Sequence, residues 1–261
     1  DIFLFYYLAK KLDIIGGDES RENLVSGFIL KWVRDGIITI REKESGAIVK
    51  KKNYDMYLDV DAKFENKQET ALYKMFILAS KDGVLQTKAF QKWCSKHYKK
   101  IDDWFTKVDN VTEDSMNKNG YAKTKTIYKR LLFWNIPRDR TVWTDKAYDQ
   151  CLYVWGFNNF LEDEDNMKEK AAIEVKLWDE YLIFAAVLGI ADRVEKQLKV
   201  AIPRYEETST YNNFPIYYYT HTFAHNSMSA ASSAASAGQG GSSSFSGGGG
   251  GFSGGGGGGV R

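Results

Sequence analysis

The longest apolar run in the chain limits its fold more than any other feature. The run extends from Leu182 to Ala191 and is bracketed by charged residues, among them Asp179, Glu180 and Asp192. A helix that crosses a bilayer needs roughly 20 predominantly apolar residues. Because this run is too short for that, it predicts a helix that is buried inside a folded domain.

The composition favours a folded, near-neutral protein. Of the 261 residues, 43% are hydrophobic and 15% are aromatic, which is enough for a substantial core in one or two domains. The formal net charge is +2, so any attraction to nucleic acid or acidic lipid must come from a local patch. Cys94 and Cys151 lie apart in apolar surroundings, which predicts buried free thiols and a reducing compartment.

A helix followed by two strands is predicted near the N-terminus. From Ser20, a good N-cap, apolar residues recur at helical spacing as far as Asp35. The segment IITIRE and the alternating segment around Met56 then predict two strands joined by the turn ESG. This order is that of the second half of a winged helix, so residues 1–62 are expected to form a first winged-helix-like unit.

The same order of elements is predicted a second time. Helices are expected over residues 69–80 and from Thr87 onward, and residues 121–141 are expected to supply a second wing. Residues 63–142 are therefore expected to form a second winged-helix-like unit.

A helical region and a tail complete the prediction. Residues 143–205 are expected to form a C-terminal helical region, in which a turn at Gly189 separates the buried helix from a last amphipathic helix. Residues 206–261 are first aromatic and then mostly Ser, Ala and Gly, which predicts a flexible tail because such a segment buries little apolar area. The predicted fold class is mainly α with small β wings (α+β).

No pattern in the sequence points to catalysis or to a bound metal. His97 lies among lysines, which predicts a solvated helix face. His221 and His225 have the spacing of two zinc ligands on a helix but lack a third ligand. The acidic residues 162–165 lack the spaced ligands and the glycine of a calcium loop. We therefore expect a protein that is not an enzyme and has no catalytic residues, no metal site and no cofactor.

Basic residues gather on the first predicted wing. A winged helix can place its second helix in the major groove of DNA and its wing on the phosphate backbone. The helix SRENLVSGFILKWVRDG offers few side chains suited to reading a groove, which weakens this interpretation. The candidate nucleic-acid contacts are Arg41, Lys43, Lys50, Lys51 and Lys52.

Several segments resemble a known family. GFNNFLED, KLWDEYLIFAAVLGIADRVEKQL and the final FSGGGGGFSGGGGGGVR together resemble the C-terminal part of the bacterial YciQ-like predicted membrane proteins, and FILKWVRDGIITIRE resembles their helix-then-strand segment. That domain has no assigned function. The resemblance implies a parent protein with a transmembrane helix and with this region at the cytoplasmic face of the bacterial cell membrane.

The chain also differs from that family. Many members carry two hydrophobic spans before the GFNNFLED-like segment, whereas residues 121–148 here contain Arg130, Asp139 and Arg140, so no span fits. The chain begins with DIFLFYYLAKK, which indicates the C-terminal piece of a longer protein whose membrane anchor lies in a missing N-terminal segment.

The first functional prediction is a non-enzymatic cytoplasmic interaction domain of a membrane-anchored bacterial protein. It is expected to dock a protein partner or to self-associate at the membrane, because aromatic residues are favoured in protein interfaces. The candidate partner contacts are Phe160, Trp178 and Tyr181. The alternative is a membrane-tethered winged-helix regulator that binds DNA through the basic wing.

Overall fold

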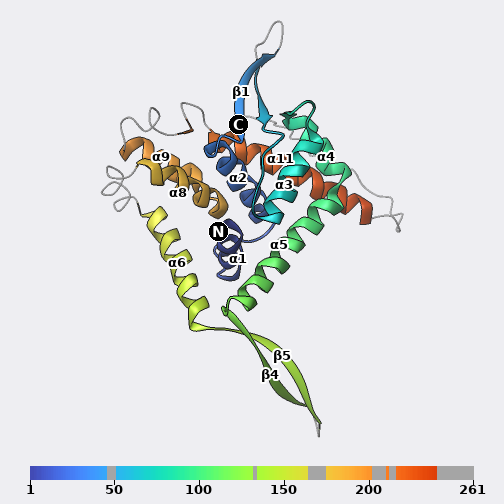
Figure 1. The fold of residues 1–261 in the computed structure, drawn as a ribbon, viewed down its shortest axis with the longest axis vertical. Helices are drawn as coiled ribbons and strands as arrows, with labels where there is room; N and C mark the ends of the chain where they lie inside the picture. The colour runs from blue at the N-terminus through green and yellow to red at the C-terminus, as the bar shows by residue number, and fades with distance from the viewer. Residues whose placement is uncertain (46–50, 132–133, 164–174, 202–209, 212–215, 240–261) are drawn as a thin grey trace, which may run out of the picture.

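Helices dominate the computed structural model, and two hairpins extend from opposite ends of the helical body (Figure 1). The structure describes residues 1–45, 51–131, 134–163, 175–201, 210–211 and 216–239. The helices are α1 (Ile2–Lys11), α2 (Glu19–Arg34), α3 (Lys67–Ala79), α4 (Thr87–Lys96), α5 (Tyr98–Lys118), α6 (Asp145–Glu162), α8 (Val175–Leu188), α9 (Ala191–Ala201) and α11 (Ile216–Gln239). The strands are β1 (Ile38–Ser45), β2 (Lys51–Leu58), β3 (Val84–Gln86), β4 (Ala122–Leu131) and β5 (Trp134–Trp143).

Helix α2 forms the centre of the core and is buried around most of its circumference. Leu24, Phe28 and Trp32 are almost inaccessible to solvent. At Gly27 the helix comes so close to α8 that a Cβ atom would lie 2.6 Å from the Cγ2 atom of Val187. A glycine at this position allows the two backbones to approach, as small residues do between packed helices. The apolar run that starts at Leu182 therefore lies in a buried helix, α8, which packs on α2.

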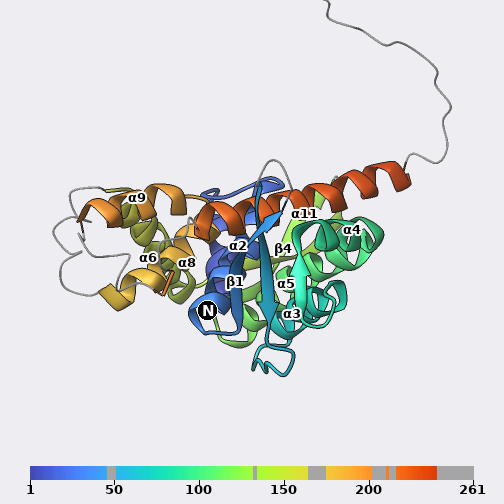
Figure 2. The ribbon, with the colours of Figure 1, turned by 90° about the horizontal axis from the view of Figure 1, so that it is seen from above.

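The prediction of a flexible tail is wrong for residues 216–239, which form helix α11. Figure 2 shows it lying along one side of the body over α2 and α4. Phe223 stacks on Phe90 with a centroid separation of 5.2 Å, and the hydroxyl groups of Ser26 and Thr220 lie 3.2 Å apart. The small residues that predicted flexibility allow this helix to pack closely, and Ser227 is fully buried. The rest of the predicted tail, residues 206–209, 212–215 and 240–261, lies outside the described residues.

The first sheet joins the two predicted winged-helix-like units. β1 and β2 form the predicted antiparallel hairpin, with Ile38 opposite Leu58. β3, from the second predicted unit, pairs with β2 and places Leu85 opposite Met56. All of these residues belong to one contiguous hydrophobic core. The first predicted wing is thus present as a hairpin, and the division into units at residues 62 and 63 stays a prediction.

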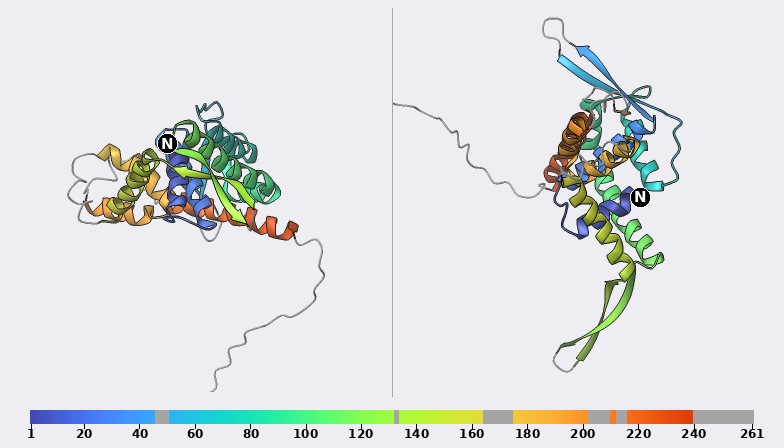
Figure 3. Two further views of the ribbon diagram at one scale, coloured as in Figure 1. Left: turned by 90° about the horizontal axis from the view of Figure 1, so that it is seen from below. Right: turned by 90° about the vertical axis from the view of Figure 1, so that its left-hand side faces the viewer.

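The second hairpin, β4–β5, is a sheet of its own and projects from the body (Figures 1 and 3). Its register runs from Ala122 opposite Trp143 to Leu131 opposite Trp134. At its base, the Thr144 hydroxyl donates to the carbonyl oxygen of Gly120 at 2.8 Å. Helices α5 and α6 lead into and out of this hairpin, so it is fixed to the body at one end.

Two further predictions agree with the structure. Gly189, at φ +79°, separates α8 from α9, as the turn prediction requires. Cys94 and Cys151 are buried free thiols. Burial raises the pKa of the Cys94 thiol to about 12, which keeps it protonated and unreactive at neutral pH.

Candidate functional site

The basic wing predicted as a nucleic-acid contact is the β1–β2 hairpin. Arg41 is exposed, and its guanidinium lies 4.6 Å from the centre of the Tyr57 ring. The register sets Arg41 opposite Asp55, so acidic residues alternate with the basic ones. Lys50 lies outside the described residues. The remaining candidates, Lys43, Lys51 and Lys52, stand opposite Asn53, Ser45 and Glu44 in the register.

The predicted recognition helix cannot enter a DNA groove. It is α2, which lies between α8 and α11 at the centre of the core. Its polar side chains are also engaged, because Arg21 pairs with Asp102 at 2.7 Å and Lys31 pairs with Glu69 at 2.6 Å. The prediction that α2 reads the major groove of DNA is therefore wrong. Contact between the hairpin and phosphates stays a prediction.

The three predicted partner contacts form a packed aromatic cluster between α6 and α8. Trp178 is only 2% exposed; it stacks on Phe160 and makes an edge contact with Tyr181 at a centroid distance of 5.1 Å. Phe160 and Tyr181 are half-buried. The structure thus brings these residues together, but burial leaves Trp178 unavailable to a partner. Trp178 is therefore a residue of the core and not the partner contact that was predicted.

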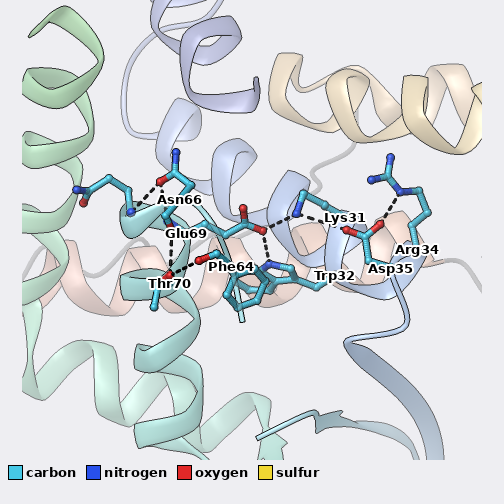
Figure 4. A network of polar contacts seen from close by, with 9 residues as sticks. Lys31, Trp32, Arg34, Asp35, Phe64, Asn66, Glu69 and Thr70 are labelled. Atoms are coloured by element: carbon cyan, nitrogen blue, oxygen red, sulfur yellow. Dashed lines mark hydrogen bonds and ion pairs between the residues drawn. The ribbon is translucent and has the colours of Figure 1, made fainter. Parts of the chain in front are cut away.

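A network of polar contacts joins α2 to α3 (Figure 4). Its residues line part of a cavity of about 690 Å³ between α1, α2, α3 and α8. The Glu69 carboxylate accepts hydrogen bonds from Lys31 Nζ at 2.6 Å and from Trp32 Nε1 at 2.9 Å. Asp35 lies 3.4 Å from Lys31 and accepts from Arg34 Nε at 2.9 Å. Two carboxylates and two cations are thus bonded to one another. This arrangement connects α2 to α3, and each of the two carboxylates is paired with a cation.

The described histidines and acidic residues do not assemble a metal centre. No group of three or more His, Cys, Asp or Glu side chains in the described ranges could hold an ion. His221 and His225 stack on α11 with centroids 6.4 Å apart, and His225 Nδ1 lies 2.8 Å from Glu22 Oε2. His97 is half-buried against Trp93 rather than solvated on a helix face.

Helix α6 carries an exposed apolar stripe that the sequence analysis missed. Tyr148, Leu152 and Trp155 follow one another at positions i, i+4 and i+7, which places them on one face of the helix. Trp155 is 55% exposed and the neighbouring Tyr153 is 72% exposed. The face that contains Cys151 packs inward. A helix with two apolar stripes can turn only one of them toward its own core. The second apolar stripe of α6 was therefore the signal in the sequence that could have revealed this surface.

A cavity adjoins this stripe. It measures about 660 Å³, lies between α1, α6 and α8, and is lined in part by Leu152 and Tyr153. On its inner side, Phe157 makes edge contacts with Phe5 and Tyr181 at centroid distances of 6.0 and 5.2 Å. We call Tyr148, Leu152 and Trp155 the α6 face. With the cavity beside it, the α6 face forms an apolar surface suited to another apolar segment.

Residues 130–198 match a family model described as the C-terminal domain of a predicted membrane protein (DUF2207). The match covers β5, α6, α8 and most of α9, and so includes the α6 face. No curated protein and no solved structure matches the chain. Among the residues with described positions, no helix combines the length and the apolar character needed to cross a bilayer.

Proposed function

We propose that this chain is a non-enzymatic interaction module of a membrane-anchored bacterial protein, and that the α6 face joins two copies of it. The observation that carries the proposal is the exposure of Tyr148, Leu152 and Trp155 on one helical stripe. A contiguous apolar patch on a protein surface marks an interaction site far more often than scattered exposed residues do. Its place within the segment similar to predicted membrane proteins supports a role near the membrane.

A second copy is the occupant best matched to this surface. Helices associate by burying residues spaced at i, i+4 and i+7, and a second α6 presents the same set. Two copies related by a two-fold axis would place this stripe against itself. Gly156 lies beside Trp155, and a Cβ atom there would meet nothing within 4 Å, so a partner helix has room to approach.

The association is expected to be weak in solution. Full burial of one large apolar side chain contributes about 1.5 to 3 kcal/mol. The three residues of the α6 face form a small interface, because stable complexes bury about 800 Å² on each partner. A membrane anchor in the parent protein would raise the local concentration of copies. A cytoplasmic location is part of the proposal; the buried free thiols Cys94 and Cys151 support it.

Sedimentation equilibrium of the full chain over a range of concentrations tests this function. We expect a reversible dimer that Leu152→Glu or Trp155→Glu abolishes, because a carboxylate would be buried without a partner. Leu78→Glu is the matched control, since Leu78 is 65% exposed on α3, away from the α6 face. A monomer at every concentration, or equal dimerisation of all variants, would overturn the proposal.

A further inference from the structure

One face of the β4–β5 hairpin gathers several basic residues. Between residues 122 and 143 the sequence has six basic residues, Lys123, Lys125, Lys129, Arg130, Arg138 and Arg140, and one acidic residue, Asp139. Residues on a strand alternate between the two faces of a sheet. The register therefore puts Lys123, Lys125 and Ile127 on the same face as Val142 and Arg138, while Arg130 falls on the other face.

The side chains described on this first face are basic or apolar, and all of them are exposed. We call Lys123, Lys125, Ile127, Ile136, Arg138 and Val142 the hairpin face. The three aliphatic residues among them are each about two-fifths exposed: Ile127 39%, Ile136 43% and Val142 42%. Among the hairpin side chains that are described, only Ala122 is buried. The hairpin face therefore contributes little to the core of the protein.

We propose that the hairpin face docks on an anionic lipid surface. Basic residues within a Debye length of such a surface are attracted to its headgroups, and exposed aliphatic residues gain by entering the boundary between headgroups and acyl chains. The hairpin face offers both kinds of group side by side. The hairpin is also attached only at its base, so it can reach a flat surface that the helical body does not touch (Figure 3).

A lipid surface fits these residues better than a nucleic acid does. Phosphates of a duplex would satisfy Lys123, Lys125 and Arg138, but the charged backbone offers no apolar surface for Ile127 and Ile136. Single strands are bound by stacking of bases on aromatic rings, and the hairpin face has no described aromatic side chain. This inference does not rest on the α6 face, which belongs to a different element.

Flotation of the full chain with lipid vesicles tests the inference. The probes are vesicles of phosphatidylcholine alone and vesicles with equal parts of phosphatidylglycerol, each at low and high salt. The charge variant is Lys123→Gln, Lys125→Gln, Arg138→Gln, and the apolar variant is Ile127→Ser, Ile136→Ser, Val142→Ser. The matched control, Lys92→Gln, Lys99→Gln, Lys100→Gln, removes three exposed charges from α4 and α5.

We expect binding to the anionic vesicles only, reduced by salt. Each basic residue lost at the surface costs about a factor of five, so the charge variant should bind roughly a hundredfold more weakly. The apolar variant should also weaken binding, the control should bind like the unaltered chain, and Leu152→Glu should bind vesicles normally. All variants should retain the thermal unfolding transition of the unaltered chain, because the substituted residues are exposed.

Three results would overturn the inference. The first is failure of the unaltered chain to bind anionic vesicles at low salt. The second is equal loss of binding in the charge variant and the control, which would show that only net charge matters. The third is full binding by the apolar variant together with tight binding of a random DNA duplex, which would identify nucleic acid as the ligand.

Discussion

The two hairpins are both antiparallel, but the rest of the chain packs against them in different ways. Both were predicted as wings, of which only the first was singled out as basic, and both are antiparallel with eight or ten residues in each strand. In β1–β2, a third strand covers one edge, and Met56 and Leu58 enter the core. Among the described residues, β4–β5 pairs with no third strand, and its only buried side chain is that of Ala122. Basic composition alone therefore does not identify a binding surface. The first hairpin contributes side chains to the core, whereas the described side chains of the second are almost all exposed.

The largest expected difference between the hairpins is in stability. Met56 is fully buried, so Met56→Ala should lower the free energy of unfolding by about 2 to 5 kcal/mol. Ile136→Ala on β5 is the matched change at an exposed site and should stay within about 0.5 kcal/mol. Urea unfolding followed by circular dichroism measures both. Equal losses would remove the distinction between a core hairpin and a free one.

A smaller effect should follow from the bond that attaches the first hairpin to α11. The Tyr219 hydroxyl donates to the carbonyl oxygen of Tyr54 at 3.1 Å. Tyr219→Phe keeps the ring and removes this bond together with the hydrogen bond between the Tyr219 hydroxyl and the Thr87 side chain, which should cost about 1 kcal/mol or more. Tyr218→Phe is the matched control, because that ring is 70% exposed on the same helix. An unchanged urea midpoint for Tyr219→Phe would show that this bond does not stabilise the hairpin.

The same tyrosine gives the protein a pH dependence at alkaline pH. Burial raises the pKa of Tyr219 from 10.0 to about 12, so its contribution to stability is fully present below pH 10 and is lost as the pH rises toward 12. The unaltered chain should therefore lose stability over this interval more steeply than Tyr219→Phe does. Parallel urea midpoints for the two proteins from pH 9 to pH 12 would contradict this assignment.

The smallest effect is expected for nucleic acid at the first hairpin. Arg41 lies against Tyr57 and opposite Asp55, so the strand presents little net positive charge. Arg41→Gln should change the binding of a random duplex by less than the roughly fivefold loss expected for a full phosphate contact. Fluorescence anisotropy at low and near-physiological salt measures this. A large, salt-dependent loss would restore the DNA-binding alternative through phosphate contacts.

Local pattern predicted the elements, and packing between distant elements decided their roles. The strand around Met56 and the buried helix before Gly189 follow from periodicity within a short window. The pairing of β3 with β2 joins residues about 30 positions apart in sequence, for which no local signal exists. Helix α11 was missed because Ser227 and its small neighbours resemble a linker in composition, while their close packing on α2 and α4 depends on tertiary structure.

The candidate surfaces were predictable only in part. The helix containing Tyr148 and Trp155 follows from the sequence, but which of its two apolar stripes faces solvent is set by the position of α1 and α8. For Trp178, an aromatic residue in an apolar run suits a core as well as an interface, and only the structure distinguishes them. The hairpin face needs the strand register, which brings Arg138 beside Ile127.

Hydrogen–deuterium exchange of the full chain, with and without anionic vesicles, tests most directly whether β4–β5 is the free binding surface and β1–β2 is not. Without vesicles, amides around Met56 should exchange slowly and those around Ile127 quickly, because only the former lie in the core. With vesicles, protection should appear on β4–β5 and leave β1–β2 unchanged. Protection that appears on β1–β2, or on neither hairpin, would contradict the account.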